Sequence, residues 1–512
     1  MRTALLVTVL LVAAGLRFTA LEFGGPDFEA RPDENGVVAT LAAVERGRFF
    51  PTLVLYGGGY FEPLRIFILL WQAAFWDDGT AAQIAAGRLN EVRIAVRTWS
   101  ALLSLVTVWL VYLVGRRAGD ERAGLLAAAL LAVLPLAVRE ARFGKADTAA
   151  AAAGALVMAA LVLPRGGPRQ RGMLAGAASA LALGTKALAS VLPAVVVGLC
   201  WPEADRRHTP WRALAWAAAT CAVVFMALNG FAFRYPHDTA AMARFLLGAL
   251  RDASWLPGGD QLPSPLVYHA TVSLRWGCGW AVTLLAAPAV AYGLWSGGAP
   301  RVIALLAAAH ALAVQASPMV LARFLLPALP ATCVAIGVLI VRLVDRALPG
   351  GGARAAATAV IAVLLLVEPT LASLRLVELL GRVDTRSLAG DWIAAHIPAG
   401  ARIVSWGAPP GAADYGRPPT RGRPVVQRLS PEQWTAGDTY VVWHRHPLPY
   451  SSDPVPAGVR LRRLVAFDSF RDERATDAVF EPIDAFYLPL GRLDRVERPG
   501  PRIEIFAVEP DD

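Results

Sequence analysis

Long apolar runs that recur along the whole of this 512-residue chain constrain its fold more than any other feature. A bilayer-spanning helix needs roughly 17–25 mostly apolar residues. Only 17% of the residues are charged, whereas a soluble domain carries about a quarter charged residues. The runs predict a polytopic α-helical membrane protein with about eleven spans. They lie at about 4–21, 97–114, 123–138, 147–163, 172–187, 189–201, 211–231, 276–295, 302–317, 321–344 and 355–373.

Arginines in the short loops predict the orientation of the chain. Alternate loops are rich in arginine, and the positive-inside rule assigns such loops to the cytoplasmic side. We therefore expect an N-terminus inside, with the first run an uncleaved helix, because no convincing small-residue cleavage site follows it. The outer face then receives residues 22–96, 139–146, 232–275 and the C-terminal region. The arginines concerned are Arg116, Arg117, Arg122, Arg165, Arg169, Arg171, Arg206, Arg207, Arg212, Arg301, Arg342, Arg346 and Arg354.

Two outer regions differ from the spans in character. Residues 62–76, EPLRIFILLWQAAFW, are too short for a span and favour a helix lying in the membrane interface, within the outer loop 22–96. Residues 374–512 are charged and rich in proline. Within them, DTRSLAGDWIAAHIPAG predicts a helix capped by Asp384 or Thr385, and ARIVSWG, TYVVWHR and RIEIFAVEP have strand-like composition. We expect a transmembrane domain over 1–373 and a small extracytoplasmic α/β domain over 374–512.

An acidic pair follows the first predicted span. Asp33 and Glu34 are adjacent in GGPDFEARPDENG, at the membrane surface. Such carboxylates can act as a general base or as metal ligands. The alternative is a solvated loop, since the same stretch also holds Asp27.

The second acidic site has cations beside it. The chain contains only two lysines, and one of them, Lys145, lies in ARFGKADTAA before an alanine-rich helix. Arg142 precedes it and Asp147 follows it. Asp147 could simply cap the helix. Cations grouped at a helix N-terminus on the outer face, against the positive-inside trend, also indicate an anion site, and a phosphate is the obvious partner.

Four further residues are candidates for the same outer site. Lys186 ends the span in LALGTK and could either snorkel to lipid headgroups or point inward to a phosphate. His269 and Arg275 come from SPLVYHATVSLRWGCGW, where a lone histidine is more often structural. Arg323, in ARFLLPALP, lies at the mouth of an apolar run, where an arginine is a functional-site candidate by default.

Several chemistries find no motif in the chain. It lacks GxxxxGK[ST], a GxGxxG after a strand, HExxH, GxSxG and DxD. No nucleotide site is recognisable, and no basic patch interleaved with aromatic residues points to nucleic acid. If the protein transfers a chemical group on the outer face, the donor of that group would have to be carried across the membrane, for example on a lipid phosphate.

The chain resembles the GT-C superfamily of integral-membrane glycosyltransferases in five stretches and in their order. These are the outer PDE, GKAD, LGTK, PLVYH…SLRWGCGW and RFLLPALP. The branch they are most similar to contains bacterial protein O-mannosyltransferases and lipid A aminoarabinose transferases. The resemblance covers about 17–345 and extends to the C-terminal region. It implies transfer of a sugar, hexosyl or pentosyl, from a polyprenyl-phosphate donor, with inversion at the anomeric carbon.

The resemblance also implies roles for residues. Asp33 matches the proposed base, Glu34 is its neighbour, and Asp147 matches a second-loop aspartate that orients the acceptor or the base. Lys145, Lys186 and Arg323 match positions near the donor phosphate, and we add Arg142, His269 and Arg275 to that set. No cofactor is expected. Some relatives need a divalent metal, but no cluster of metal ligands supports one here.

These expectations describe an enzyme of a bacterial cytoplasmic membrane, with its active site and C-terminal domain on the outer face. Its partners would be the lipid-linked donor, membrane lipids and a protein, glycan or lipid acceptor. The alternative is a transporter or lipid flippase with an outward-facing anion site. Transporters often contain inverted repeats and charges at mid-membrane. No repeat is visible here, and the informative charges lie at the outer ends of spans, which favours the enzyme.

Overall fold

The structure is a computed structural model of the whole chain. It describes residues 2–25, 32–47, 56–164, 166–200, 210–249, 251–254, 262–407, 418–420, 425–427, 434, 438–445, 459–472, 477–481 and 488–509. Arg165, Arg206 and Arg207, which contribute to the orientation prediction, lie outside these residues. The chain forms two compact units. The first comprises Met1–Leu21, Asp33–Asp252 and Pro263–Leu374, and the second comprises Glu22–Pro32, Ala253–Leu262 and Arg375–Asp512, so one of the boundaries falls inside a long helix, after Leu374.

The first unit is helical. Its first helices are α1 (Arg2–Phe18), α2 (Pro32–Glu45), α3 (Gly58–Phe75), α4 (Thr80–Ala85), α5 (Leu89–Ala118), α6 (Glu121–Val133), α7 (Pro135–Glu140), α8 (Ala146–Val162), α9 (Pro168–Lys186), α10 (Leu192–Cys200) and α11 (Pro210–Leu228). They are followed by α12 (Phe231–Arg234), α13 (Pro236–Ala249), α14 (Pro265–Tyr268), α15 (Arg275–Cys278), α16 (Trp280–Ser296), α17 (Gly298–Ala313), α18 (Leu329–Ala347) and α19 (Gly351–Leu380). Short turns of 3-10 helix are η1 (Ala189–Val191), η4 (Val314–Ala316) and η5 (Ala322–Ala328), and η3 (His269–Leu274) is a π-helical turn.

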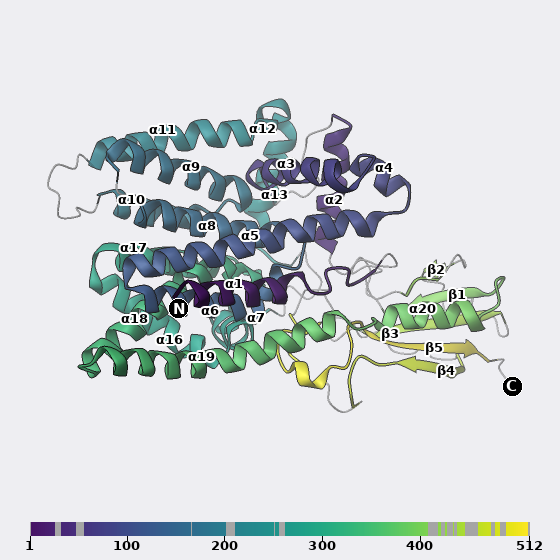
Figure 1. The fold of residues 1–512 in the computed structure, drawn as a ribbon. Helices are drawn as coiled ribbons and strands as arrows, with labels where there is room; N and C mark the ends of the chain where they lie inside the picture. The colour runs from purple at the N-terminus through teal and green to yellow at the C-terminus, as the bar shows by residue number, and fades with distance from the viewer. Residues whose placement is uncertain are drawn as a thin grey trace. The chain divides into compact units, whose positions relative to one another are not determined.

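The long helices of this unit lie side by side. Figure 1 shows α11, α9, α8 and α5 in succession, and α5 also packs on α6, which in turn packs on α18. Small residues allow this close approach: a Cβ added at Gly176 of α9 would lie 2.3 Å from the carbonyl oxygen of Ala217 in α11. Small residues at helix interfaces are the usual means by which membrane helices pack.

Each predicted span coincides with helix in the described residues. The predicted number of membrane-spanning helices, about eleven, is not confirmed. Within the described residues, five helical stretches are both long and apolar enough to cross a membrane: Leu89–Ala118, Pro210–Leu228, Gly298–Ala316, Ala322–Ala347 and Gly351–His396. Shorter apolar helices lie at Thr3–Phe18, Ala146–Val162, Ala189–Cys200 and Trp280–Ser296. The run predicted at 123–138 is interrupted at Leu134, where Pro135 begins α7, because proline favours the first turn of a new helix. The predicted interfacial segment is helical, as α3.

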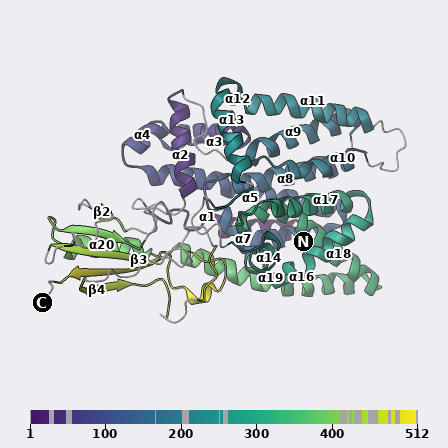
Figure 2. The same ribbon diagram turned by 180° about the vertical axis from the view of Figure 1, so that it is seen from behind.

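The second unit contains a five-stranded sheet. The strands are β1 (Arg402–Trp406), β2 (Val425–Gln427), β3 (Thr439–Arg445), β4 (Leu461–Phe467) and β5 (Arg502–Val508), in the order β2-β1-β3-β5-β4. β1 is parallel to β2 and β3, whereas β5 is antiparallel to β3 and β4. The view from behind shows the same sheet (Figure 2). A 3-10 turn, η8, spans Leu493–Arg495.

One helix, α20 (Thr385–His396), covers a face of this sheet. Ala389, Ile393 and Ile397 pack against inward-facing residues of β1, β3 and β5. The helix begins as predicted: Asp384 is the N-cap, and its carboxylate accepts a hydrogen bond from the Arg386 amide at 2.8 Å. The three predicted strands are β1, β3 and β5. The small α/β fold is therefore confirmed, while β2 and β4 were not predicted.

Candidate functional site

Asp147 is the centre of a buried ion-pair cluster. It lies in the first turn of α8, and its side chain is 2% exposed. Lys186 Nζ, at the end of α9, lies 2.5 Å from Asp147 Oδ1. Lys145 Nζ and Arg323 Nε lie 3.4 Å and 3.8 Å from Oδ2. Lys145, not Asp147, occupies the N-cap position of α8, so the carboxylate of Asp147 holds cations instead of capping the helix.

Lys145 is shielded from solvent. Its side chain is 0% exposed, and Nζ lies 2.7 Å from Glu140 Oε2 as well as 3.4 Å from Asp147. The ring of Phe143 lies 5.6 Å from the same ammonium. Lys145 therefore joins two buried carboxylates, and this geometry favours a positioning role over direct contact with a ligand. Sequence reasoning missed Glu140, although a carboxylate inside an apolar stretch is itself a signal.

Lys186 and Arg323 are the accessible cations of the cluster. Their side chains are 21% and 14% exposed. The ring of Phe324 lies beside both, 5.0 Å from Lys186 Nζ and 6.0 Å from the Arg323 guanidinium carbon. Two charges held between a buried carboxylate and an aromatic ring can meet an anion that enters from the exposed side.

Asp33 joins the cluster through Arg323. It lies in the first turn of α2, and its side chain is 32% exposed. Arg323 Nη2 lies 3.5 Å from Asp33 Oδ2, which also accepts a long hydrogen bond of 3.5 Å from the Tyr56 hydroxyl. Burial raises the pKa of Tyr56, as do Asp33 and Asp147, so the phenol stays protonated and donates. Arg323 thus bridges one exposed and one buried carboxylate.

Glu34, the neighbour of Asp33, has a different environment. Its side chain is 3% exposed and forms a bidentate pair with Arg97, with Nε–Oε1 and Nη2–Oε2 distances of 2.8 Å and 2.7 Å. The amide of Gly144 donates to Oε1 at 2.8 Å. Burial alone would raise the pKa of Glu34, but the guanidinium of Arg97 and the Gly144 amide outweigh it and lower the pKa. Glu34 therefore anchors the loop that carries Lys145 and leads into α8.

Three residues predicted at the phosphate have other contacts. Arg142 is buried, and its Nη1 donates to the carbonyl oxygen of Leu16 at 2.8 Å. His269 is buried, and its Nδ1 lies 2.9 Å from Ser273 Oγ. Arg275 Nη1 lies 2.6 Å from Glu368 Oε1, and its guanidinium lies 4.2 Å from the ring of Trp276 and from that of Trp280. These contacts link none of the three to Asp147, so their role at a phosphate stays a prediction.

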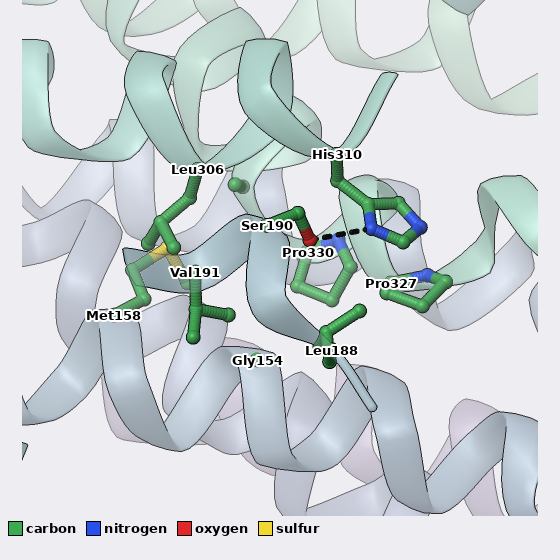
Figure 3. Close-up of a pocket in the computed structure, with 10 residues that line it drawn as sticks. Gly154, Met158, Leu188, Ser190, Val191, Leu306, His310, Pro327 and Pro330 are labelled. Atoms are coloured by element: carbon green, nitrogen blue, oxygen red, sulfur yellow. Dashed lines mark hydrogen bonds between the residues drawn. The ribbon is translucent and has the colours of Figure 1, made fainter. Parts of the chain in front are cut away.

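A small cavity lies among residues of α8, η1, α17, η5 and α18 (Figure 3). Its lining is mostly apolar, and Ser190 and His310 contribute a hydrogen bond of 2.8 Å between Oγ and Nδ1. Neither residue was predicted from the sequence. The cavity is lined by Gly154, Met158, Leu188, Ser190, Val191, Leu306, His310, Pro327, Pro330 and Ala331.

The carboxylates of this site are paired with cationic side chains. Within the part of the chain that the structure describes, no three His, Cys, Asp or Glu side chains gather as ligands. The two carboxylates nearest the exposed side, Asp33 and Asp147, both face cationic side chains. A divalent ion would have to displace these cations.

Comparisons with known proteins concern the same region. A family model described as dolichyl-phosphate-mannose-protein mannosyltransferase matches residues 83–229. This segment contains Lys145, Asp147 and Lys186. It does not reach Asp33 or Arg323. No curated protein matches the chain in sequence.

Solved structures match most of the chain in fold. ArnT from Cupriavidus metallidurans bound to undecaprenyl phosphate is 15% identical, with a TM-score of 0.53 over 86% of this chain and 93% of that one. The Archaeoglobus fulgidus oligosaccharyltransferase in complex with Zn and sulfate is 14% identical, with a TM-score of 0.46 over 79% of this chain and 60% of that one. The arabinofuranosyltransferase AftD from Mycobacteria is 17% identical, with a TM-score of 0.39 over 100% of this chain and 42% of that one. At these identities the likeness to ArnT is one of fold.

Proposed function

We propose that the chain is a membrane glycosyltransferase of the GT-C superfamily, as the family match over residues 83–229 and the ArnT-like fold support. Its reaction would be an inverting transfer of a sugar from a polyprenyl-phosphate donor to an acceptor on the outer face of the membrane. The observation that carries the proposal is the cluster itself. Two accessible cations, Lys186 and Arg323, are clamped by the buried Asp147, and Arg323 also faces the partly exposed Asp33.

The cations suit the leaving group. When the bond between the sugar and its phosphate breaks, the phosphodiester becomes a polyprenyl phosphate monoester, and negative charge builds on the phosphate oxygen that leaves. Cations fixed in advance stabilise such a developing charge without having to reorganise. Arg323 offers a planar fork and Lys186 a point charge, both suited to phosphate. ArnT, which has a similar fold, has been solved bound to undecaprenyl phosphate.

Asp33 suits the role of general base. It is the most exposed carboxylate of the cluster and is within reach of an acceptor that approaches from solvent. The acceptor oxygen forms a bond to the anomeric carbon, its proton passes to Asp33, and the electron pair of the broken bond leaves with the phosphate. Attack in line with the leaving group inverts the anomeric centre. The Tyr56 hydroxyl, 3.5 Å from Oδ2, donates a long hydrogen bond to this carboxylate.

The buried part of the cluster has a supporting role in this mechanism. Glu140 and Asp147 hold Lys145, and Asp147 in turn holds Lys186. The exact position of these cations matters for the reaction, because a misplacement of about 1 Å can lower the rate about 100-fold. Lys145 and Glu140 are thus positioning residues, and Lys186, Arg323 and Asp33 meet the reactants.

The proposal is tested by sugar transfer in membranes that contain the protein. A panel of radiolabelled polyprenyl-phosphate sugars is supplied to wild type, to Asp33→Asn and to a matched control, Glu62→Gln. Glu62 is also an outer-loop carboxylate, but its partner is Arg65, at 2.9 Å and half exposed to solvent. We expect label to reach an endogenous acceptor with wild type and Glu62→Gln and not with Asp33→Asn. Equal transfer by all three proteins would remove Asp33 as the base.

A further inference from the structure

Two segments that carry the accessible cations are joined at a second place, away from the ion pairs. Ser190 lies four residues after Lys186, and the carbonyl of Phe324 directly follows Arg323. His310 of α17 lies between them. Its Nδ1 is 2.8 Å from Ser190 Oγ, and its Nε2 is 2.8 Å from the carbonyl oxygen of Phe324 (Figure 3 shows the first of these bonds).

The chemistry of these groups fixes the direction of both hydrogen bonds. A carbonyl oxygen can only accept, so Nε2 of His310 carries the proton and donates to Phe324. In the neutral imidazole, Nδ1 then has a lone pair and accepts from the Ser190 hydroxyl. A single tautomer therefore satisfies both neighbours, and the imidazole is a bridge of defined length between the two segments.

The backbone beside Lys186 needs such a bridge. Ala187 ends α9 in the left-handed region, at φ 50°, which an alanine rarely adopts. Residues in this region persist when the surrounding structure holds them there, and they gather at functional sites. The amide of Leu188 donates to Ala182 and closes this turn from one side, while the bond from Ser190 to His310 holds it from the other.

Phe324 transmits the same constraint to the second cation. Its ring lies beside the ammonium of Lys186 and the guanidinium of Arg323, and its carbonyl is the acceptor of His310. Movement of the imidazole would therefore alter the backbone turn after Lys186 and the ring that both cations touch.

We propose that His310, through Ser190 and the Phe324 carbonyl, is a positioning residue that sets the separation of Lys186 and Arg323 for the donor phosphate. This inference rests on the proposed function for its consequence in catalysis. The geometric part, the placement of Lys186, can be tested without any activity.

The scarcity of lysine gives a direct probe. The chain has only two lysines, and Lys145 is buried, so reductive methylation with ¹³C-formaldehyde labels Lys186 and the N-terminal amine. The Lys186 resonance is assigned as the one lost in Lys186→Gln. We compare Ser190→Ala and His310→Gln with a matched control, Ser179→Ala, whose hydroxyl bonds within α9 to the carbonyl of Ala175.

We expect the dimethyl-Lys186 resonance to shift in Ser190→Ala and in His310→Gln and to stay in place in Ser179→Ala. An unchanged resonance in Ser190→Ala and His310→Gln would overturn the proposal. Ser190→Ala removes a single oxygen atom, so it remains informative if His310→Gln does not fold.

The kinetic test separates positioning from general destabilisation. Ser190→Ala should raise the KM for the lipid donor by about tenfold or more and leave the KM for the acceptor unchanged. When Lys186→Gln is already present, adding Ser190→Ala should raise the donor KM little further. Equal changes in both KM values, or full additivity with Lys186→Gln, would overturn the proposal. A wild type that transfers no sugar would refute the proposed function instead, and the methyl resonance would still decide the placement of Lys186.

Discussion

Glu34→Gln should destabilise the fold strongly, although the substituted side chain has the same shape. The carboxylate and Arg97 are both buried, with N–O distances of 2.7 Å and 2.8 Å. At 2.7 Å and an effective dielectric constant of about 20, the attraction between unit charges is about 6 kcal/mol, most of which offsets the cost of burying them. Removing one partner leaves the other charge uncompensated, which costs about 3–5 kcal/mol.

Thermal unfolding of the purified protein in detergent measures this loss. Asp33→Asn, one residue away and partly exposed, is the matched control and should stay within about 1 kcal/mol of wild type. Glu34→Gln combined with Arg97→Gln should recover part of the loss, because no unpaired charge remains.

The lowered pKa of Glu34 in the folded state makes its stabilising effect depend on pH. The contribution of Glu34 to the free energy of unfolding is complete above its unfolded-state pKa, near 4.3, and is lost as pH falls through its folded-state pKa. The difference between wild type and Glu34→Gln should shrink over that acidic range. A Glu34→Gln protein within about 0.5 kcal/mol of wild type at pH 7 would refute the reasoning.

Three other outcomes are expected. Lys186→Gln and Arg323→Gln should each lower kcat for transfer by about 100-fold or more, because each removes a fixed charge from the leaving phosphate; a change below threefold in a radiolabel assay would contradict this. Gly58→Ala should abolish folding, since its Cβ would lie 1.7 Å from the carbonyl oxygen of Leu228, whereas Gly15→Ala, with nothing within 4 Å, should behave as wild type in size-exclusion chromatography of the extracted protein. Transfer should persist in excess EDTA, because side-chain cations occupy the site; loss of activity that Mg²⁺ or Mn²⁺ restores would show that a metal is needed.

Much of the fold was predictable because the signals are local. Apolar runs and arginine-rich loops can each be recognised within a stretch about as long as one helix. Every predicted span is helical in the described residues. The cap at Asp384 and the strands β1, β3 and β5 also have local signals. The break at Leu134 was missed although Pro135 marks it. β4 was missed because its segment, Leu461–Phe467, contains two adjacent arginines and lacks an alternating pattern.

The candidate site was predictable in its members and not in their arrangement. Asp33, Asp147, Lys186 and Arg323 are charges at the ends of apolar runs, which single them out in the sequence. Burial, however, depends on tertiary packing. Glu34 is buried whereas its neighbour Asp33 is partly exposed, and Lys145 is buried whereas Lys186 is partly exposed. The bridge from Ser190 through His310 has no local signal, because its three groups come from η1, α17 and η5.

The stoichiometry of lipid release is the most direct test of the proposed activity. Purified protein is placed in vesicles with a polyprenyl-phosphate sugar that supports transfer, and free polyprenyl phosphate is measured alongside transferred sugar. A transferase releases one polyprenyl phosphate for each sugar transferred, and Asp33→Asn should release none. Passage of the intact donor from one leaflet to the other, with no polyprenyl phosphate released, would contradict the assignment and identify the protein as a flippase.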